Sequence, residues 1–443
     1  LDFSFLKEKN VSGKNHFFLK NKTILNFNKF EETELLYQIQ QVSDDTYLKA
    51  YKIDSPIINH QTLLTSSISL NSYSESLSFN TKLQVFEDLN KPVNDRYEFV
   101  YPSYQITKRI DENFNSHGQF IVNSSGFMKN YDTNVYEKAN INDLIFNTNY
   151  KITNNGFKNN LNFLLKNVNS NSEKSNSYKS GTSHSLASLI QYNTFYPLIK
   201  KGTNSTSKIN SKFNIKFSPS NTKNMHNANR RLDTNNIYSL NRISSNDTVE
   251  GGTSLTYGSE YIWSDNEDRD IFRANLANVW RLEENKNLPS QSGLNRKISD
   301  IIGNIEYIPS DKLNINYDFS IDNNLKDNNY QQLKTELRVN NIVTSFEYLN
   351  ENKTSDQSSY LSSNTSYIIN KSSKVSFERR DNKKTNMTEF YNLIYQYEND
   401  CLIAAVEYNK DYYSDRDMEP EENIFFKLTI TPFGQTSSPN LLK

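Results

Sequence analysis

The chain has little of what a soluble globular protein of its size uses to fold. Only 35% of its 443 residues are hydrophobic, whereas average globular chains have about 45–50%. Its single cysteine excludes an internal disulfide, and no apolar run approaches the ~18 residues that a membrane-spanning helix needs. The 50 basic and 51 acidic residues are interspersed and leave a net charge of −1, so no basic footprint argues for a nucleic-acid partner.

Aromatic residues in alternating patterns are what the chain has in abundance, with 28 Tyr and 26 Phe. In the stretch KLNINYDFSID (312–322) every second residue is apolar, which is typical of a strand with one apolar and one polar face. The same alternation recurs at 77–85, 209–217 and 424–430. These patterns predict about 22 strands, and no segment has a convincing helical periodicity.

The connections between these predicted strands alternate in length. Short connections at 340–341 and 398–400 are followed by longer ones at 351–358 and 412–422. In the N-terminal part we expect longer connections at 42–60, 88–97, 128–141 and 169–183, and the longest of all lies at 219–249. Short turns that alternate with long loops are typical of transmembrane barrels. The predicted fold is therefore all-β, a large antiparallel transmembrane β-barrel whose apolar faces meet outer-membrane lipid.

The chain offers little for catalysis or for cofactor binding. Its five histidines have no metal-ligand spacing, and neither a P-loop nor a GxSxG motif occurs. The acidic stretch DNEDRD (265–270) lacks the glycine and the terminal glutamate of a calcium-binding loop. We therefore expect no enzyme activity, no metal and no cofactor.

Four segments resemble the LPS-assembly outer-membrane protein family LptD, particularly its alphaproteobacterial form. They are QVSDDTYLKAYKI (41–53), NIYSLNRISSNDTVEGGTSLTYG (236–258), PSQSGLNRKISDIIGNIEYIP (289–309) and the C-terminal segment 397–434. They follow the family's order along nearly the whole chain, although the Asn-rich middle, 110–235, matches weakly.

The resemblance implies a barrel of about 26 strands that inserts lipopolysaccharide (LPS) into the outer leaflet through a lateral seam. The implied partners are LPS, an LptE-like plug lipoprotein and periplasmic LPS-bridge components. Residues 1–434 are predicted to form the barrel domain and 435–443 a C-terminal tail. Because the chain starts at LDFSFLKEK without a methionine, we expect a fragment or processed piece. Because the pattern predicts about 22 strands rather than the family's approximately 26, we expect the chain to lack the family's periplasmic domain and first strands.

The resemblance also assigns candidate site residues. Cys401, predicted just after the short turn at 398–400, is the candidate for an interdomain disulfide, with a buried free thiol as the alternative. The predicted strand of the lateral seam contains Ile424, Phe426, Lys427, Leu428, Thr429, Ile430 and Phe433. The charged residues of the motifs are Arg242, Asp247, Glu250 and Asp300. We expect these charges in loops or in the barrel interior, either in salt bridges or in contact with the plug or the LPS sugar.

Two other functions remain open from the sequence. A general porin or nutrient transporter would have the same barrel, but would leave Cys401 without a role. A soluble surface adhesin or β-solenoid would share the strand content without entering a membrane.

Overall fold

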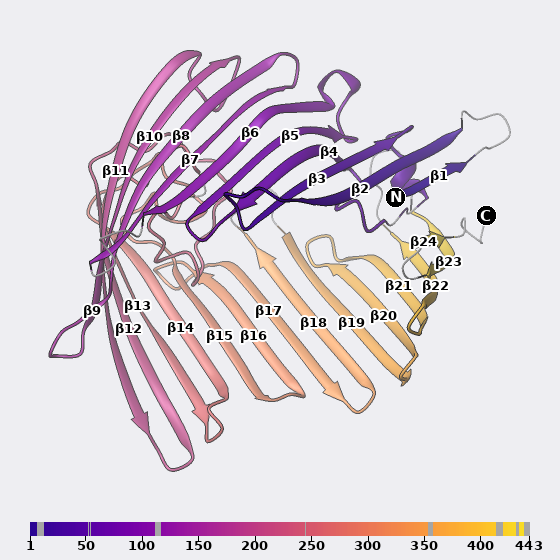
Figure 1. The fold of residues 1–443 in the computed structure, drawn as a ribbon. Coiled ribbons are helices and arrows are strands. Elements are labelled where there is room, and N and C mark those ends of the chain that lie inside the picture. Colours follow the sequence, from indigo (N-terminus) through magenta and orange to yellow (C-terminus); the bar gives the residue numbers. More distant parts are fainter. Residues whose placement is uncertain are drawn as a thin grey trace. The chain divides into compact units, whose positions relative to one another are not determined.

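The structure is a computed structural model that describes residues 1–6, 13–51, 53, 55–110, 117–243, 245–352, 358–412, 420–430 and 434–437. Nearly all of them belong to antiparallel strands or to the connections between strands (Figure 1). The chain divides into two compact units, which are described separately. No helix in the described part of the chain is long and apolar enough to span a membrane.

Unit 1 comprises Leu1–Asn149, Phe163–Ser188 and Asn246–Thr248. Its complete strands are β1 (Asp2–Leu6), β2 (Lys14–Leu25), β3 (Glu32–Val42), β4 (Leu63–Tyr73), β5 (Leu77–Asp88), β6 (Tyr97–Ile110), β7 (Gly118–Tyr131) and β8 (Val135–Thr148). From β1 to β8, each strand pairs antiparallel with its successor, and β8 pairs with β10 (Lys158–Glu173). The connections contain one turn of α-helix, α1 (Tyr47–Ala50), and one 3₁₀ turn, η1 (Val93–Asp95).

Unit 2 comprises Tyr150–Asn162, Leu189–Ser245 and Val249–Lys443. Its complete strands are β9 (Lys151–Ile152), β12 (Ser205–Ser218), β13 (Gly252–Asp265), β14 (Asp270–Arg281), β15 (Ile301–Ser310), β16 (Leu313–Ile321), β17 (Asn328–Val339), β18 (Ile342–Glu351), β19 (Ser358–Asn370), β20 (Ser373–Asn382), β21 (Met387–Glu398), β22 (Leu402–Asp411), β23 (Glu422–Ile430) and β24 (Gly434–Ser437). Strands β10 (Lys158–Glu173) and β11 (Gly181–Lys201) contribute residues to both units. From β11 to β24, each strand pairs antiparallel with its successor.

These strands confirm the predicted all-β antiparallel class. The described residues form 24 strands, two more than the roughly 22 that the sequence predicts. The short strands β9, with two residues, and β24, with four, account for this difference. The predicted alternation of connection length is present in unit 2, where turns at 311–312 and 340–341 alternate with connections at 282–300 and 322–327.

One predicted connection is wrong. The segment 128–141 was expected to be a longer connection, but it belongs to the hairpin of β7 and β8, with only Asp132–Asn134 between the strands. Asp132 and Asn134 have φ values of 30° and 65°, and Asp and Asn tolerate this left-handed region better than other side chains. The polar residues on both sides of the turn therefore continue the strands.

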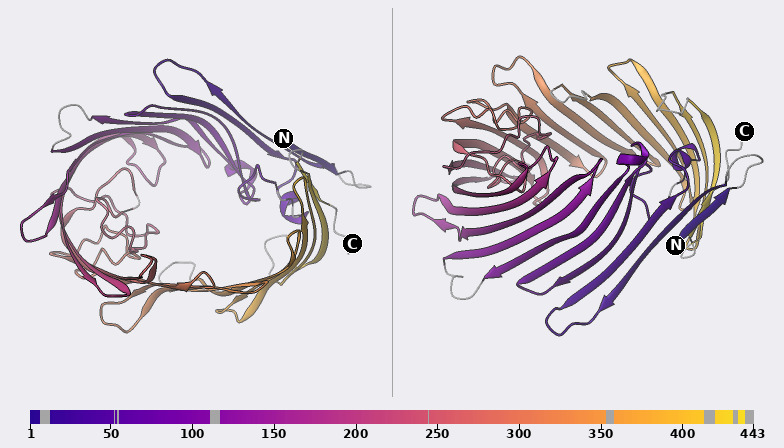
Figure 2. Two further views of the ribbon diagram at one scale, coloured as in Figure 1. Left: turned by 60° about the horizontal axis from the view of Figure 1, so that its bottom comes forward. Right: turned by 90° about the horizontal axis from the view of Figure 1, so that it is seen from above.

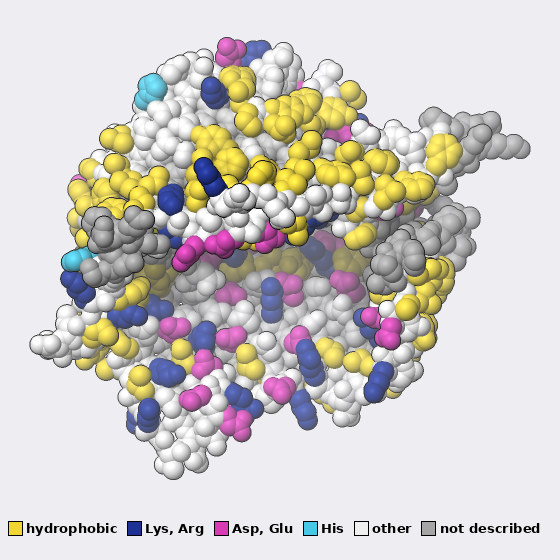
Figure 3. All heavy atoms as spheres, viewed as in Figure 1, with side chains coloured by type: hydrophobic (Ala, Val, Ile, Leu, Met, Phe, Trp, Pro, Cys, Tyr) yellow, Lys and Arg dark blue, Asp and Glu magenta, His cyan; other side chains and the backbone are white. Residues whose placement is uncertain are grey.

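Each strand has two chemically different faces, here called inner and outer. On β12 the outer residues Phe213, Ile215 and Phe217 are 43%, 51% and 49% exposed, whereas the inner residues Asn214 and Lys216 are each 1% exposed. In Figure 3 hydrophobic side chains gather on the visible face of β2–β8, and the visible face of β14–β20 carries mixed polar and charged side chains. Such an apolar outer face is far larger than a soluble monomer exposes.

The apolar cores lie under connections. In unit 1 the connection after β3, which contains α1, packs Tyr47 and Leu48 against Phe18, Leu64 and Leu89. In unit 2 the core forms between strands and two long connections, as described below.

Candidate functional site: a loop-covered inner face

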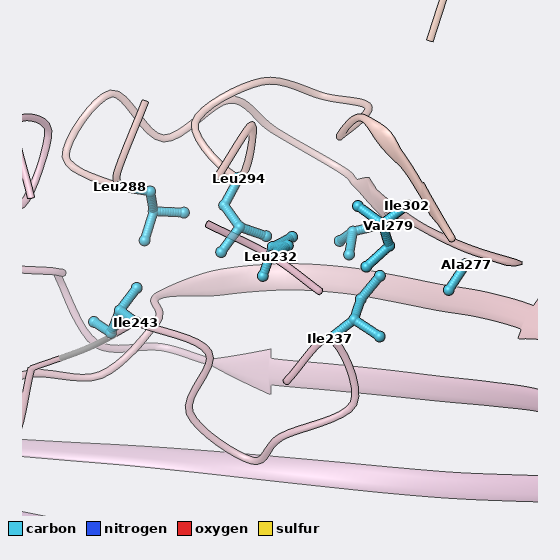
Figure 4. Close-up of a cluster of buried hydrophobic side chains, with 8 residues drawn as sticks. All are labelled: Leu232, Ile237, Ile243, Ala277, Val279, Leu288, Leu294 and Ile302. Carbon is cyan, nitrogen blue, oxygen red and sulfur yellow. The ribbon is translucent and has the colours of Figure 1, made fainter. Parts of the chain in front are cut away.

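Two long connections, which belong to unit 2 except for Asn246–Thr248, fold onto the inner face of β12–β15. They are 219–251, between β12 and β13, and 282–300, between β14 and β15, and both lie on the concave side of these strands (Figure 2). Figure 4 shows the apolar contacts that hold them there, which join the connections to β14 and β15 and involve Leu232, Ile237, Ile243, Ala277, Val279, Leu288, Leu294 and Ile302. This surface is called the covered inner face.

A buried ionic cluster anchors the first connection to the strands. Arg242 Nε donates to Glu250 Oε2 over 2.7 Å, and Arg281 Nη1, from the end of β14, donates to Glu250 Oε1 over 2.6 Å. Lys216 Nζ, from β12, lies 3.6 Å from Glu250 Oε2. All four side chains are at most 2% exposed.

The strands supply further acceptors to this cluster. Arg242 donates through Nη1 to Thr256 Oγ1 over 2.8 Å and through Nη2 to Ser254 Oγ over 2.7 Å. Burial alone would raise the pKa of Glu250, but Arg242, Lys216 and Arg281 overcome it and hold the pKa well below its usual range. The carboxylate is therefore charged at neutral pH and joins the 219–251 connection to two strands.

The Glu-Gly-Gly motif has a steric cause. A Cβ on Gly251 would lie 2.2 Å from the carbonyl oxygen of Ser220, and Gly252 has a φ of 88°. Gly251 N donates to Thr222 Oγ1 over 2.8 Å, which ties the two ends of the connection together. Glycine is needed at both positions, because one approaches backbone closely and the other has a left-handed conformation.

Asp300 anchors the second connection. It forms an ion pair with Arg296, and its Oδ2 accepts hydrogen bonds from Asn329 Nδ2 over 2.8 Å and Ser320 Oγ over 3.2 Å. Arg296 also donates to Asp322 over 2.9 Å. The carboxylate of Asp300, 2% exposed, thereby joins this connection to β16 and β17.

Asp247 lies in unit 1, in contrast to the other three motif charges. It forms a hydrogen bond with Tyr178, whose pKa is raised by burial and by this carboxylate. The neighbouring Asn246 accepts a hydrogen bond through its carbonyl oxygen from Lys166 Nζ over 2.7 Å, and Lys166 also pairs with Asp143. Asp247 and Asn246 thus make these contacts within unit 1.

The remaining motif also anchors a connection. In SDDTYL, Asp44 Oδ1 accepts from the backbone N and Oγ1 of Thr46 over 3.0 and 2.7 Å, at the start of α1. Asp45 accepts from Arg96 over 2.7 Å, and Tyr47 and Leu48 are 2% and 0% exposed. All three internal motifs that carry the family resemblance therefore hold long connections against inner faces.

The predicted seam residues lie on β23, except Phe433, which is outside the described residues. Lys427 forms an ion pair with Glu407 of β22 over 2.7 Å, and β24 pairs with residues 427–430 of β23. The predicted tail begins at residue 435, whereas the structure places 435–437 in β24. The role of β23 in a seam stays a prediction.

Cys401 is exposed. It ends the three-residue connection between β21 and β22, where its backbone N donates to Asn399 Oδ1 over 3.1 Å. Its position after a short turn agrees with the sequence prediction, but the disulfide itself stays a prediction.

Beyond the two connections lies a second part of the same inner face, here called the bare inner face, on β16–β19. A cavity of about 530 Å³ is lined there by Asn314, Asn316, Lys334, Glu336, Ser345, Glu347, Ser362 and Asn364, among others. Lys334 Nζ lies 3.7 Å from Glu347 Oε1, with both side chains partly in solvent. In the described part of the chain no group of three or more His, Cys, Asp or Glu side chains could hold a metal ion.

Partners of the motif charges were missed in the sequence. Arg281 and Lys216 stand at inward positions of ordinary strand patterns, so nothing local distinguishes them. Arg281 is separated from Glu250 by 31 positions, and the pairing arises only when the strands align.

Strands with apolar outer faces, polar inner faces and long connections folded inward define a large outer-membrane β-barrel protein. The family model of LPS transport system D (LptD) matches residues 16–380. The chain belongs to this family, and its function is LPS transport and assembly at the outer membrane.

Solved structures that are similar to this chain have low sequence identity to it. The siderophore receptor PirA from Acinetobacter baumannii is 7% identical, with a TM-score of 0.40 over 88% of this chain and 75% of that one. The ferric enterobactin receptor PfeA from Pseudomonas aeruginosa, a Q482A mutant, is 8% identical, with a TM-score of 0.36 over 98% and 76%. The FrpB iron transporter from Neisseria meningitidis is 8% identical, with a TM-score of 0.35 over 93% and 83%. No curated protein matches the sequence.

Proposed function

We propose that this chain conducts LPS without catalysing a reaction on it. The saccharide moves along the polar inner faces, and the acyl chains leave sideways through a lateral seam that includes β23. An LptE-like lipoprotein fills the interior, and periplasmic LPS-bridge components deliver the substrate. The driving energy comes from those components.

The bare inner face carries this proposal. Its side chains are amides, hydroxyls and half-exposed charges, which exchange hydrogen bonds readily with sugar hydroxyls. Asn304 Nδ2 donates to Asn316 Oδ1 over 2.7 Å and to Asp318 Oδ1 over 2.9 Å, so the amides are already oriented by their neighbours. The opposite face of the same strands is apolar, with the paired residues Ile342 and Tyr367 44% and 49% exposed, and it suits lipid rather than sugar.

A pair of photocrosslinking probes tests the route in cells that make the full-length protein. One probe replaces Asn364 on the bare inner face, and the other replaces Tyr367 on the outer face of the same strand. We expect an LPS adduct at Asn364 that disappears when synthesis of new LPS is blocked. The adduct at Tyr367 should persist, because it reports LPS already in the outer leaflet.

Failure to find an adduct at Asn364, in protein shown to be inserted by heat-modifiable gel mobility, would contradict the route. Probes at Lys427 and Thr429 test the seam separately. Adducts at these two positions that depend on new LPS would support lateral exit, and adducts confined to Asn364 would contradict it.

A further inference from the structure

A second cavity lies where the two connections leave the strands. It has a volume of about 420 Å³ and is formed at the ends of β12, β13 and β14. Its walls include Arg281, Ser218, Thr222, Thr253, Asn285 and Asn287. Asn287 Nδ2 donates to the Thr222 carbonyl over 3.1 Å, and Asn285 Nδ2 lies 3.4 Å from Thr222 Oγ1. The polar walls are therefore held in place by their own hydrogen bonds.

The charge next to this cavity is not balanced. Two guanidinium groups, those of Arg242 and Arg281, share a single carboxylate, Glu250, and all three side chains are at most 2% exposed. The other acceptors of these guanidinium groups are neutral, such as Ser254 Oγ, which accepts from Arg242 Nη2 over 2.7 Å. Neutral acceptors satisfy hydrogen bonds but do not cancel charge, and uncompensated buried charge is costly.

Arg281 brings this excess positive charge to the cavity wall. Its Nη1 and Nη2 bond to Glu250 and to the Gly251 carbonyl, but its Nε has no hydrogen-bond partner within the described residues. Two carboxylates also line the cavity, Glu283 and Glu284, and both are exposed. Solvent screens these two exposed charges far more than it screens the largely buried guanidinium of Arg281, which forms part of the cavity wall.

We propose that this cavity is a subsite for an anionic sugar, in which a phosphate or carboxylate lies against the Arg281 wall and hydroxyls meet the Ser, Thr and Asn side chains. The subsite rests on the proposed function, because the LPS saccharide would supply such a group. Free phosphate has the same anionic chemistry without the hydroxyl-bearing ring, so binding of the two ligands can be compared.

The test uses full-length protein in detergent micelles and calorimetric titration with glucose 1-phosphate, glucose and inorganic phosphate. We expect glucose 1-phosphate to bind at least ~10-fold more tightly than either of the other two. Glucose lacks the anionic group, and inorganic phosphate lacks the ring hydroxyls. Arg281→Lys should weaken binding of glucose 1-phosphate by about 10-fold, because Lys does not reproduce the planar fork. Arg281 also anchors Glu250, so its variant needs a folding check by gel mobility.

A rim variant avoids that difficulty. Glu283→Gln with Glu284→Gln removes two exposed charges that oppose an anion, and should tighten glucose 1-phosphate binding by about 2–3-fold. The matched control, Glu267→Gln with Asp268→Asn, removes two exposed carboxylates from the connection between β13 and β14, at the other end of these strands, and should leave the affinity unchanged.

Equal affinity for glucose and glucose 1-phosphate would overturn the subsite, as would a rim variant that behaves like its control. Inorganic phosphate that binds as tightly as glucose 1-phosphate would overturn the sugar specificity. The adduct at Asn364 is measured separately in the wild-type protein. Its presence alongside a negative titration would refute the subsite alone, and its absence would refute the transport route.

Discussion

The charged side chains of unit 2 are buried and closely paired on the covered inner face, whereas they are exposed and loosely paired on the bare inner face. On the covered inner face Glu250 is 1% exposed and accepts bonds of 2.7 and 2.6 Å from two guanidinium groups. On the bare inner face the Lys334 and Glu347 side chains are 54% and 31% exposed and 3.7 Å apart. Buried pairs are expensive to break, whereas exposed pairs contribute little.

The difference explains where the family motifs occur. The motifs with Arg242, Glu250 and Asp300 all belong to the covered inner face, whereas no recognised motif lies on β17–β19. Anchoring requires particular partners at particular distances, and a hydrophilic surface along which a sugar slides does not. In this chain the recognised motifs therefore coincide with the residues that hold the long connections.

The largest effect should come from Glu250→Gln. The change leaves Arg242, Arg281 and Lys216 buried without a counter-charge, which should destabilise the folded connection by about 3–5 kcal/mol. The measurement is limited proteolysis of the 219–251 connection, read against heat-modifiable mobility of the strands. Glu336→Gln on the bare inner face, whose partner Arg338 is 60% exposed, is the control and should change stability by less than about 1 kcal/mol. Equal protease sensitivity of the two variants would remove the contrast between the two parts.

Leu294→Ala should have the second-largest effect on stability. Leu294 is 0% exposed in the apolar cluster. Truncation of a buried Leu leaves a cavity that the surrounding side chains fill only in part, so the free energy of unfolding should fall by about 2–4 kcal/mol. Leu325, 69% exposed in the connection after β16, is the matched control, and Leu325→Ala should be nearly neutral. Thermal melting of the connection, followed by hydrogen exchange at 282–300, measures the difference. A neutral Leu294→Ala would mean that the connection does not depend on this cluster.

As the pH falls, the covered inner face should lose stability before the bare inner face does. The folded-state pKa of Glu250 lies below its ordinary value of 4.5, so its stabilising contribution is complete above about pH 4.5 and is lost as the pH falls further. Asp322 shifts in the same direction, because Arg296 donates to it. We expect protease protection of 219–251 to decline below about pH 4.5 in the wild type, and to decline less steeply in Glu250→Gln. If protease protection fell with pH in the same way in the wild type and in Glu250→Gln, carboxylates other than Glu250 would be responsible for the loss of protection.

Much of this fold could be predicted from the sequence because period-two alternation is local. It revealed the strands at 209–217 and 312–322 and the alternating connections between them. The hairpin at 128–141 was missed because its polar residues continue strands rather than form a loop. The anchoring role of Arg242 and Glu250 could be suspected from charge and motif. Their partner Arg281 could not, because its pairing depends on how distant strands align.

The smallest effect concerns the border between the two parts. Arg231, from the first connection, stacks with its guanidinium 3.4 Å from the ring centre of Tyr330 on β17 and lies 3.9 Å from Glu351. Arg231→Lys keeps the charge but loses the planar stack, so about 1 kcal/mol of local stability should be lost. Hydrogen exchange at 230–236 should become faster by several-fold, while exchange at 242–250 stays unchanged, because the Glu250 cluster holds that end independently. Faster exchange over both segments would show that the covered part opens as one unit, and that the border contact governs it.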